Sequence, residues 1–212
     1  MSVSLPNGAT FSVANAYGSP VTITALTNAS PAVATATNTF AAGDFVEITS
    51  GWSKLTNKVV RLSAAAAGNF TLEGIDTTDT TLYPAGSGIG TARKITGYTQ
   101  VAQVLTTGTS GGEQQFTTYQ FVEADAQTQI PSFKTPQTMT LSIADDATQP
   151  GFIQLGKAND DRQRRAFKAT LPGGSIISYN GYVSLNRTPS MTVNEIMACQ
   201  ATFSMLCEPV RY

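Results

Sequence analysis

The chain is organised around the stretch from Gln137 to Cys207, which closes with the sequence MACQATFSMLC (residues 197–207). In this closing run the apolar residues fall on alternate positions: Met197, Cys199, Ala201, Phe203, Met205 and Cys207. The same alternation occurs in residues 139–143 and 166–171. Successive side chains of a strand leave opposite faces of a sheet, so this pattern predicts strands with one buried face. We expect the stretch to form the core of an antiparallel β domain.

Length and composition agree with a folded, strand-rich protein. The chain has 212 residues, of which 41% are hydrophobic and 13% are charged. This length suits one large β domain or a domain that carries a smaller insertion. The net charge of −1 argues against a basic surface that holds nucleic acid, because phosphate contacts need clustered lysines and arginines.

The two cysteines and the N-terminus indicate where the protein is made. Cys199 and Cys207 would lie about 26 Å apart on one unbroken strand, too far for a disulfide. We interpret them as core thiols in a reducing compartment. Residues 1–6 show no charged segment followed by an apolar one, and no apolar run is long enough to span a membrane. We therefore expect a soluble protein made in the cytoplasm.

The first 90 residues have a different texture from the core stretch. Residues 4–17 predict at most one strand. Five short strands are then expected, separated by turn residues: 21–26, 32–37, 45–48, 59–62 and 69–72. Strands at this spacing predict a small all-β module over residues 21–90, inserted into a β domain formed by residues 1–20 and 91–212. The alternative is that they form the first half of one sandwich.

A long hairpin is expected over about residues 100–136. An extended run covers residues 93–106, a flexible turn is predicted at Gly108–Gly112, and a second strand follows at 116–122. Polar and apolar residues are nearly balanced on both faces, so the hairpin cannot bury one face within its own domain. It is expected to project, or to be buried by another subunit that pairs with its edges. The alternative is a long surface loop.

One short helix is expected at about residues 148–159. Asp145 and Asp146 stand before it as candidate caps, and the charged residues 160–165 after it are interpreted as a solvated surface. Further along, Asn180-Gly181 within the predicted strand 176–185 indicates a possible bulge.

Catalytic chemistry is weakly represented. The chain has no histidine, which removes the commonest general base and any His-ligated metal. The cysteine spacing does not match a zinc site. The acidic pairs at 145–146 and 160–161 could be imagined as a cation site, but caps and solvated charge explain them better. The Gly-rich segments are not followed by the Lys and helix of a phosphate loop. We expect no catalytic residue, metal or cofactor, and no enzyme activity.

Several short motifs carry a resemblance in their order along the chain. They are Gly111–Phe116, Gln129–Pro131, Ala144–Asp146, Arg165–Phe167, Leu171–Gly174, Asn180–Ser184 and Asn194–Glu195. Over about residues 92–212 the chain resembles the major tail tube proteins of long-tailed, lambda-like siphovirus bacteriophages. Residues 23–88 resemble instead a small β module that is inserted into various phage structural proteins.

The resemblance implies a structural virion protein with an antiparallel β-sandwich or barrel fold, one short α-helix and a long projecting β-hairpin. Hexameric rings would stack into the tail tube and form the channel for DNA ejection into the host. The partners it implies are other copies of the chain, a tape-measure protein, a tail terminator and baseplate proteins, with DNA passing without sequence-specific binding and with no membrane. A channel that lets DNA slide should avoid basic side chains.

On this basis two sets of residues are expected at the assembly surfaces. The set expected to face the lumen is Gln115, Thr117, Gln120, Glu123, Asp125, Gln127 and Gln129. The set expected at contacts between subunits or rings is Arg93, Lys94, Phe116, Tyr119, Phe121 and Lys134. A register error of one residue would reverse every one of these facings.

Two other classes of function remain open at this point. One is a tail terminator, head–tail connector or baseplate ring protein of similar fold, which closes one ring without stacking. The other is a module that binds carbohydrate or a host surface through Trp52 and Tyr83. A core position for Trp52 is favoured, because a lone Trp does not make an aromatic platform.

Overall fold

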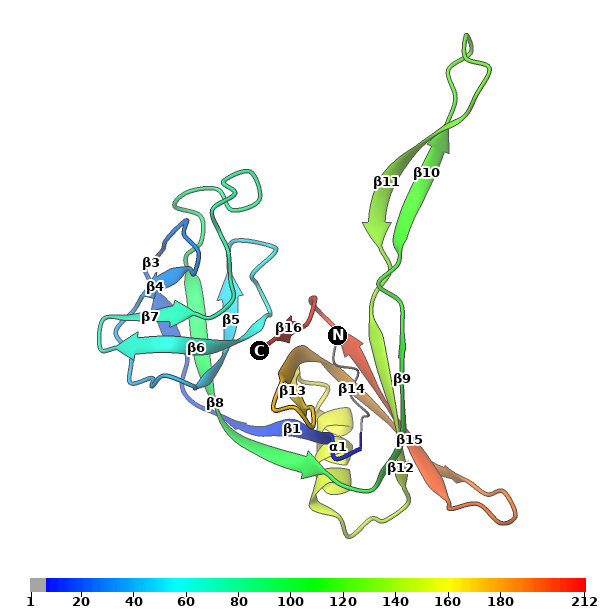
Figure 1. Ribbon diagram of the computed structural model, residues 1–212. Coiled ribbons are helices and arrows are strands. Elements are labelled where there is room, and N and C mark those ends of the chain that lie inside the picture. The colour runs from blue at the N-terminus through cyan, green and yellow to red at the C-terminus, as the bar shows by residue number, and fades with distance from the viewer. Residues whose placement is uncertain (1–6) are drawn as a thin grey trace.

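A computed structural model of the protein describes residues 7–212 and shows a mainly β molecule with a long projecting hairpin (Figure 1). The strands are β1 (Thr10–Tyr17), β2 (Val21–Ile23), β3 (Ala25–Leu26), β4 (Val33–Thr35), β5 (Phe45–Ser50), β6 (Val59–Ala66), β7 (Asn69–Leu72), β8 (Gly90–Val101), β9 (Val104–Ser110), β10 (Gln114–Tyr119), β11 (Thr128–Lys134), β12 (Thr138–Ala144), β13 (Arg165–Thr170), β14 (Ile176–Ser190), β15 (Ala198–Met205) and β16 (Val210–Arg211). In this described part of the chain one helix, α1 (Pro150–Asp161), completes the elements. The predicted fold class is confirmed. The prediction for Met1–Pro6 lies outside the described residues.

Fourteen strands form one continuous antiparallel sheet. Its order is β3-β4-β7-β6-β5-β8-β1-β13-β14-β15-β12-β9, with β2 on β8 and β16 on β14. Strand β8 joins the two halves, because residues 90–94 pair with β2 and β5 while residues 95–101 pair with β1. The N-terminal strands therefore share a backbone ladder with the rest of the chain. The separation into an inserted module of residues 21–90 and a surrounding domain stays our proposal.

The C-terminal half of the sheet curls around α1 and encloses one apolar core, as Figure 1 shows. Leu155 and Ala158 of the helix are fully buried in this core. Strand β15 contributes Cys199, Ala201 and Phe203, which are buried on one face as the alternation predicts. The ring of Phe203 lies 4.3 Å from that of Phe167, centroid to centroid. We call this half, with β1 and the second part of β8, the body.

Strands β2 to β7 surround a second core, and they form close to the five predicted positions. Trp52 is 1% exposed and lies inside this core, as the sequence favours. Its indole Nε1 donates a hydrogen bond to the Pro84 carbonyl at 2.8 Å, and its ring meets that of Tyr83 edge-on. A carbohydrate platform built on Trp52 therefore lacks its exposed ring. We call residues 21–90 the module.

The hairpin reverses at a different place from the one predicted. The turn expected at Gly108–Gly112 is wrong, because β9 continues through Gly108 and pairs with β12 up to Ser110. Gly111 and Gly112 adopt positive φ values of 80° and 82°, and there the ladder breaks before β10 begins. Glycine adopts this backbone conformation at little cost. The chain reverses instead in the loop between β10 and β11. Pairing with β12 overrides the turn signal of the small residues.

The helix begins and ends two residues later than predicted, and its cap is also different. Gln149 stands at the N-cap and makes no side-chain cap hydrogen bond. The carboxylate of Asp146 accepts hydrogen bonds from the Thr148 backbone N–H at 3.0 Å and from the Thr148 hydroxyl at 2.6 Å. It therefore stabilises the turn that precedes the helix. These bonds, led by the hydroxyl of Thr148, lower the pKa of Asp146 to about 2.

Two expectations about the last strands are also corrected. The ladder between β13 and β14 runs without a register shift through Asn180 and Gly181, so the proposed bulge is wrong. Gly181 is needed for packing, because a Cβ there would lie 2.2 Å from the Ser204 carbonyl oxygen. Strand β15 ends at Met205, so Cys207 is not on the same strand as Cys199. Both cysteines are free.

Candidate assembly surfaces

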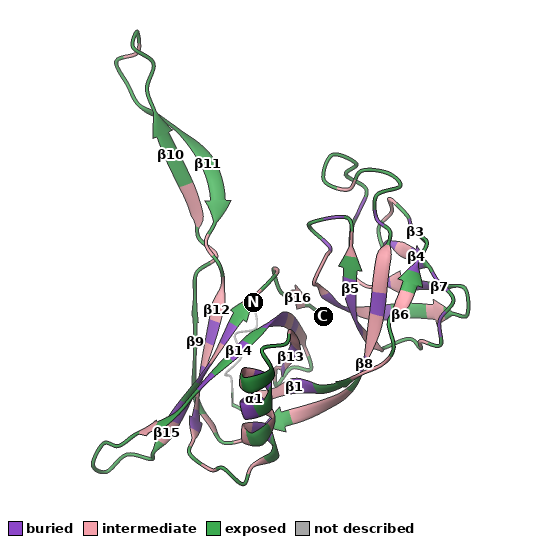
Figure 2. Cartoon of the chain, turned by 180° about the vertical axis from the view of Figure 1, so that it is seen from behind, coloured by how far each residue is buried: buried purple, intermediate pink, exposed green. Residues whose placement is uncertain are grey.

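The arm, which we define as residues 113–135, extends well beyond the rest of the molecule (Figures 1 and 2). Strands β10 and β11 pair only with each other among residues 7–212. All seven residues of β11 are exposed. Pro131 lies within β11, and proline is confined to edge strands or bulges because it cannot donate to a ladder. The arm thus has two unpaired edges in the described chain.

Cross-strand partners show which arm residues share a face, because directly opposed residues of an antiparallel pair point the same way. Phe116 is opposite Pro131 and Thr118 is opposite Gln129. On the other face Thr117 is opposite Ile130 and Tyr119 is opposite Thr128. Thr117 and Gln129 therefore point in opposite directions, and so do Phe116 and Tyr119. The register between β10 and β11 cannot be derived from composition alone.

Four residues of the predicted lumen set lie in the loop that joins β10 to β11 at the arm's tip. They are Gln120, Glu123, Asp125 and Gln127, and all four are exposed. The Gln120 side-chain amide donates a hydrogen bond to the Ala124 carbonyl at 2.7 Å. Gln115 is half-buried near the start of β10. The tip therefore combines acidic, amide and apolar side chains in one exposed loop.

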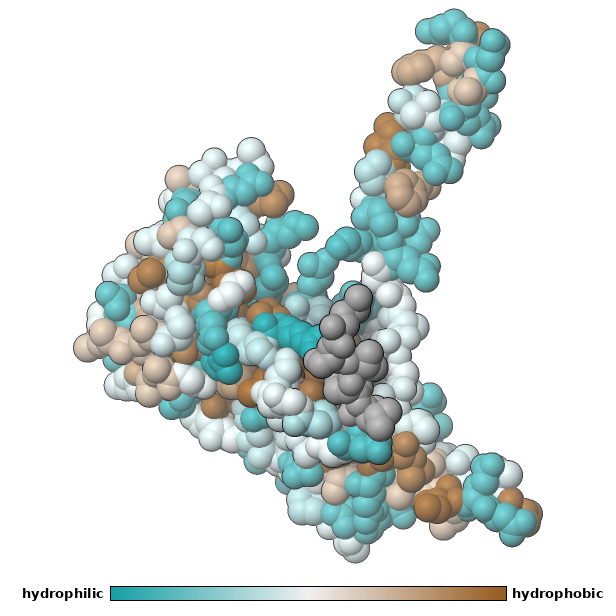
Figure 3. Space-filling model, in the orientation of Figure 1, coloured by the Kyte–Doolittle hydropathy of each residue, from teal (hydrophilic) through white to brown (hydrophobic). Residues whose placement is uncertain are grey.

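The arm exposes an unusual amount of apolar surface. Its large exposed apolar side chains are Phe116, Tyr119, Phe121, Val122, Ile130 and Phe133. Phe116 and Ile130 lie on opposite faces, and Phe121 and Val122 lie at the tip. Figure 3 shows brown side chains along the arm. Before Lys134 the arm's charged residues are Glu113, Glu123 and Asp125, all acidic. An apolar surface without basic charge is suited to burial against protein and poorly suited to holding phosphate.

The base of the arm is tied to the C-terminal segment. The Nζ of Lys134 forms an ion pair with Glu208, and both side chains are more than half exposed. This pair lowers the pKa of Glu208. Gly112 donates its N–H to the Thr135 carbonyl at 3.1 Å, which bridges the break between the two ladders. Lys134 therefore lies at the arm's base, and its charge is paired within the chain.

Two structural features are absent from residues 7–212. No group of three or more acidic or cysteine side chains that could hold a metal ion occurs within residues 7–212. Over that range no helix is long and apolar enough to cross a membrane.

A known protein family matches this chain. The model of the phage tail tube protein family matches residues 50–212, which is more than half of the chain. The chain belongs to the phage tail tube protein family. The matched range covers the whole body except β1, the whole arm, and the module from the end of β5 onward. No curated protein matches the chain.

Solved structures of tube assemblies show a weak overall similarity to this tail tube protein. The cap that terminates the anti-feeding prophage tube is 19% identical, covers 53% of this chain and 81% of its own, and has a TM-score of 0.38. The sheath–tube complex of the PVC extracellular contractile injection system is 14% identical, covers 50% and 78%, and has a TM-score of 0.36.

The tail tube protein also contains a buried polar network that sequence reasoning missed. Glu47 of β5 is 2% exposed and lies between the module and the body. Its carboxylate accepts hydrogen bonds from Arg93 Nε at 2.6 Å and from Asn180 Nδ2 at 3.0 Å. Arg164 lies 3.7 Å from the second carboxylate oxygen. A buried carboxylate is tolerated when it is paired and hydrogen-bonded in this way.

This network also shows where Arg93 and Lys94 lie. Both are on the part of β8 that pairs with β5. Arg93 binds Glu47 and covers the ring of Tyr17, while Lys94 pairs with Asp44 at 2.6 Å. Their charges are therefore engaged within the chain. The partners are 46 and 50 residues away in sequence, so no local pattern could have revealed them.

A small apolar cluster accompanies the network. Ala14, Val59, Ile95 and Ala166 are buried together between the module and the body. Ser178 donates to the Val59 carbonyl at 2.8 Å, and Arg61 donates its backbone N–H to the hydroxyl of Tyr212 at 2.7 Å. We call the cluster and the Glu47 network together the junction. It fixes the module against the body.

Proposed function

We propose that this protein is the tube subunit of a siphovirus tail, in which hexameric rings stack into a tube and the channel guides DNA into the host. The observation that carries the proposal is the arm. Its apolar side chains are exposed on both faces, and its edges have no partner strand in residues 7–212. Pairing with neighbouring arms would bury this surface and remove the free edges.

The free edge of the arm continues into the body. Strand β9 is the last strand of the large sheet, so its outer edge is also unpaired by any described strand. An edge that runs along β9 and β10 gives an adjacent copy a long ladder to join. A ring built in this way closes only when the last copy meets the first, which suits cyclic symmetry. Six copies are the number implied by the resemblance to lambda-like tubes.

The cross-strand pairs divide the residues proposed for the lumen between the two faces of the arm. One face carries Thr117, Tyr119, Thr128 and Ile130, and the opposite face carries Phe116, Thr118, Gln129 and Pro131. Each face mixes polar and apolar side chains. Thr117 and Gln129 therefore cannot both line the channel along β10 and β11.

The acidic tip supports a channel for DNA. Glu123 and Asp125 are exposed in the tip loop, and fixed negative charge near the channel repels phosphate. DNA would then slide without being held. The protein in this role is structural and needs no cofactor. It is made in the host cytoplasm and functions in the virion, with a tape-measure protein in the channel and terminator and baseplate proteins at the ends.

Negative-stain electron microscopy over a concentration series, with light scattering for mass, tests the assembly. We expect hollow tubes with a regular axial repeat. Single closed rings would contradict a tube subunit and favour a terminator or connector. A monomer at every concentration would contradict self-assembly.

The channel is tested by reversing the charge at the tip. Glu123→Lys with Asp125→Lys should leave tubes intact and hinder genome ejection, because phosphate would be held in the channel. Glu123→Gln with Asp125→Asn is the matched control and should eject more like the native protein. Normal ejection and infectivity of the lysine variant would contradict the lumenal position of the tip.

A further inference from the structure

Two unassigned features lie at opposite ends of strand β15. A pocket lies where β15 ends, at the base of the arm, and an exposed apolar loop lies where β15 begins. An eight-residue strand spans about 27 Å, so the two features are far apart on one molecule. Figure 1 shows the loop, between β14 and β15, pointing away from the arm. One copy cannot bring its own loop to its own pocket without unfolding β15.

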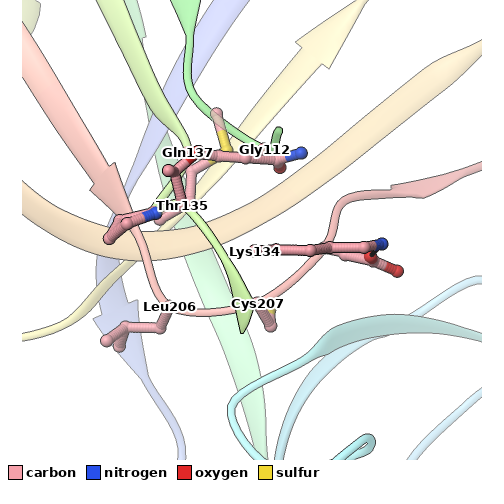
Figure 4. Close-up of a pocket in the computed structure, with 9 residues that line it drawn as sticks. Gly112, Lys134, Thr135, Gln137, Leu206 and Cys207 are labelled. Atoms are coloured by element: carbon pink, nitrogen blue, oxygen red, sulfur yellow. Dashed lines mark hydrogen bonds and ion pairs between the residues drawn. The ribbon is translucent and has the colours of Figure 1, made fainter. Parts of the chain in front are cut away.

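The base pocket is a cavity of about 210 Å³. Figure 4 shows its lining, which comes from the arm's base and from the segment that follows β15. Pro136, Met205, Leu206 and Cys207 contribute apolar surface. The pocket is open to solvent and large enough for an aliphatic side chain.

The charged residues that line the base pocket form one ion pair, and further lysines act on its carboxylate from outside the lining. Lys134 and Glu208 line it as an ion pair. Lys58 and Lys54 also lie near enough to Glu208 to help Lys134 lower the pKa of its carboxyl. Lys134 is thus the lysine that lines the pocket, and lysines outnumber the Glu208 carboxylate in its neighbourhood, which favours an apolar group that carries an additional acid.

The distal loop, residues 191–197, has that composition. Met191, Val193 and Ile196 are 76%, 85% and 67% exposed, and Glu195 is the loop's one charged residue. The loop is anchored by the pairing of Ser190 with Ala198. Inside it the Glu195 N–H donates to the Thr192 carbonyl at 3.2 Å. The loop thus presents apolar side chains from a defined turn, and no other part of the described chain covers them.

We propose that the distal loop of one copy inserts into the base pocket of a copy in the next ring of the tube. This inference rests on the proposed function. The apolar side chains would fill the cavity, and Glu195 would face Lys134 and Lys58. Each copy carries both the loop and the pocket at opposite ends, so the contact is head-to-tail and does not close on itself. The loop and pocket therefore supply the axial contact, while the arms supply the lateral one.

Cys207 makes the contact directly testable. It lines the pocket and is a free thiol. Val193→Cys places a second thiol on the loop, and added diamide serves as the two-electron oxidant. The exposed loop thiolate adds to the N=N bond of diamide, and the Cys207 sulfur then displaces the reduced hydrazine as the disulfide forms. Burial raises the pKa of Cys207 to about 11, so Cys207 does not start this reaction itself and the native protein should not cross-link. In assembled tubes we expect disulfide-linked chains whose ladder on a non-reducing gel continues past the subunit number of one ring.

Two controls separate this result from random oxidation, and a further pair of variants tests stacking. Val193→Cys with Cys207→Ser should give no ladder. Leu82→Cys, which is 49% exposed on the module, should also give none. Val193→Asp should form rings that do not stack, whereas Val193→Leu should stack normally.

The outcomes distinguish this contact from the tube itself. Native tubes without a ladder from Val193→Cys, or normal stacking of Val193→Asp, would overturn the loop–pocket contact and leave the tube intact. A ladder that stops at the ring's subunit number would also overturn it, because the contact would then lie within one ring. A native protein that forms no tubes would overturn the proposed function and this inference with it.

Discussion

The junction and the arm are both built from extended chain with mixed polar and apolar residues, yet the junction is buried and the arm is exposed. At the junction both faces of the strands are covered: Phe167 of β13 is buried in the body's core, and its neighbour Ala166 is buried against the module. In the arm the equivalent positions of β10 and β11 remain open to solvent on both faces. The same pattern therefore serves contacts inside the chain at the junction, and we propose that it serves contacts between chains in the arm.

Polar groups follow the same division. The carboxylate of Glu47 finds two direct hydrogen-bond donors, Arg93 and Asn180, within its own chain. The carboxylates of Glu123 and Asp125 have exposed positions at the arm's tip. The junction is therefore complete in a single copy, whereas we propose that the arm is completed by neighbouring copies.

The largest expected effect comes from breaking the arm. Phe116→Asp combined with Ile130→Asp places a charge on each face and should abolish rings and tubes, because burial of these positions would leave the carboxylates unpaired. The melting temperature should change by only about 2 °C, since exposed substitutions usually cost less than about 0.5 kcal/mol. Electron microscopy and thermal unfolding measure the two results.

The matched control for the arm is Thr118→Ser, which keeps the arm polar at an exposed position. It should assemble normally. Assembly of the double aspartate variant at native concentration would show that the arm is not a contact between copies.

The next effect comes from breaking the junction. Glu47→Ala removes the acceptor shared by Arg93 and Asn180 and should lower the free energy of unfolding by roughly 2–3 kcal/mol, since buried charged partners lose their counter-charge. The two arginines are partly exposed, which keeps the cost at the lower end of such cases. Urea unfolding followed by circular dichroism measures it. Because its arm is unchanged, the Glu47→Ala variant should still assemble into tubes below its melting temperature.

A surface pair in the same module provides the comparison. Glu73 binds Arg61, and both side chains are about 30% exposed. Glu73→Ala should cost less than about 1 kcal/mol. If Glu47→Ala and Glu73→Ala lowered the free energy of unfolding by the same amount, the expected difference between a buried and a solvated carboxylate would be contradicted.

The smallest effect concerns Asp146, outside both regions. Its pKa falls from 3.8 to about 2 because folding supplies hydrogen bonds to the carboxylate. The folded state therefore favours the charged form. Its contribution is complete above about pH 4 and is lost as the pH falls through 2.

Asp146→Asn removes this titration. We expect the native protein to lose stability relative to the variant between pH 4 and pH 2, measured as the difference between their melting temperatures. A difference that stays constant over this range would contradict the role of the Asp146 hydrogen bonds.

Sequence patterns predicted the buried strands better than the arm. Cys199, Ala201 and Phe203 alternate because one face of β15 meets a core, and this periodicity is visible locally. The module's strands were predicted from the turn residues that separate them. In the arm, where neither face is buried in one copy, the periodicity gives no register, so the opposite facing of Thr117 and Gln129 could not be predicted.

Long-range partners account for the other errors. Gly108 looks like a turn residue, but pairing with Thr140 of β12 keeps it in a strand. In the sequence Arg93 looks like a free surface charge, but it lies directly opposite Glu47 in the paired strands β5 and β8 and donates a hydrogen bond to it. Propensity is a weak prior when tertiary pairing supplies the hydrogen bonds. The distal loop could not be predicted from the alternation of apolar residues. That pattern begins at Met197, whose side chain is exposed and not buried with the others of the run.

Hydrogen exchange of the free subunit and of assembled tubes tests the central claim most directly. Amides of Phe45–Ser50 in β5 should exchange slowly in both states, because the junction is complete in one chain. Amides on the outer edges of β10 and β11 should exchange fast in the free subunit and slowly in tubes, because neighbouring arms supply their hydrogen-bond acceptors. Arm amides that exchange equally fast in both states would contradict the claim that other copies complete the arm.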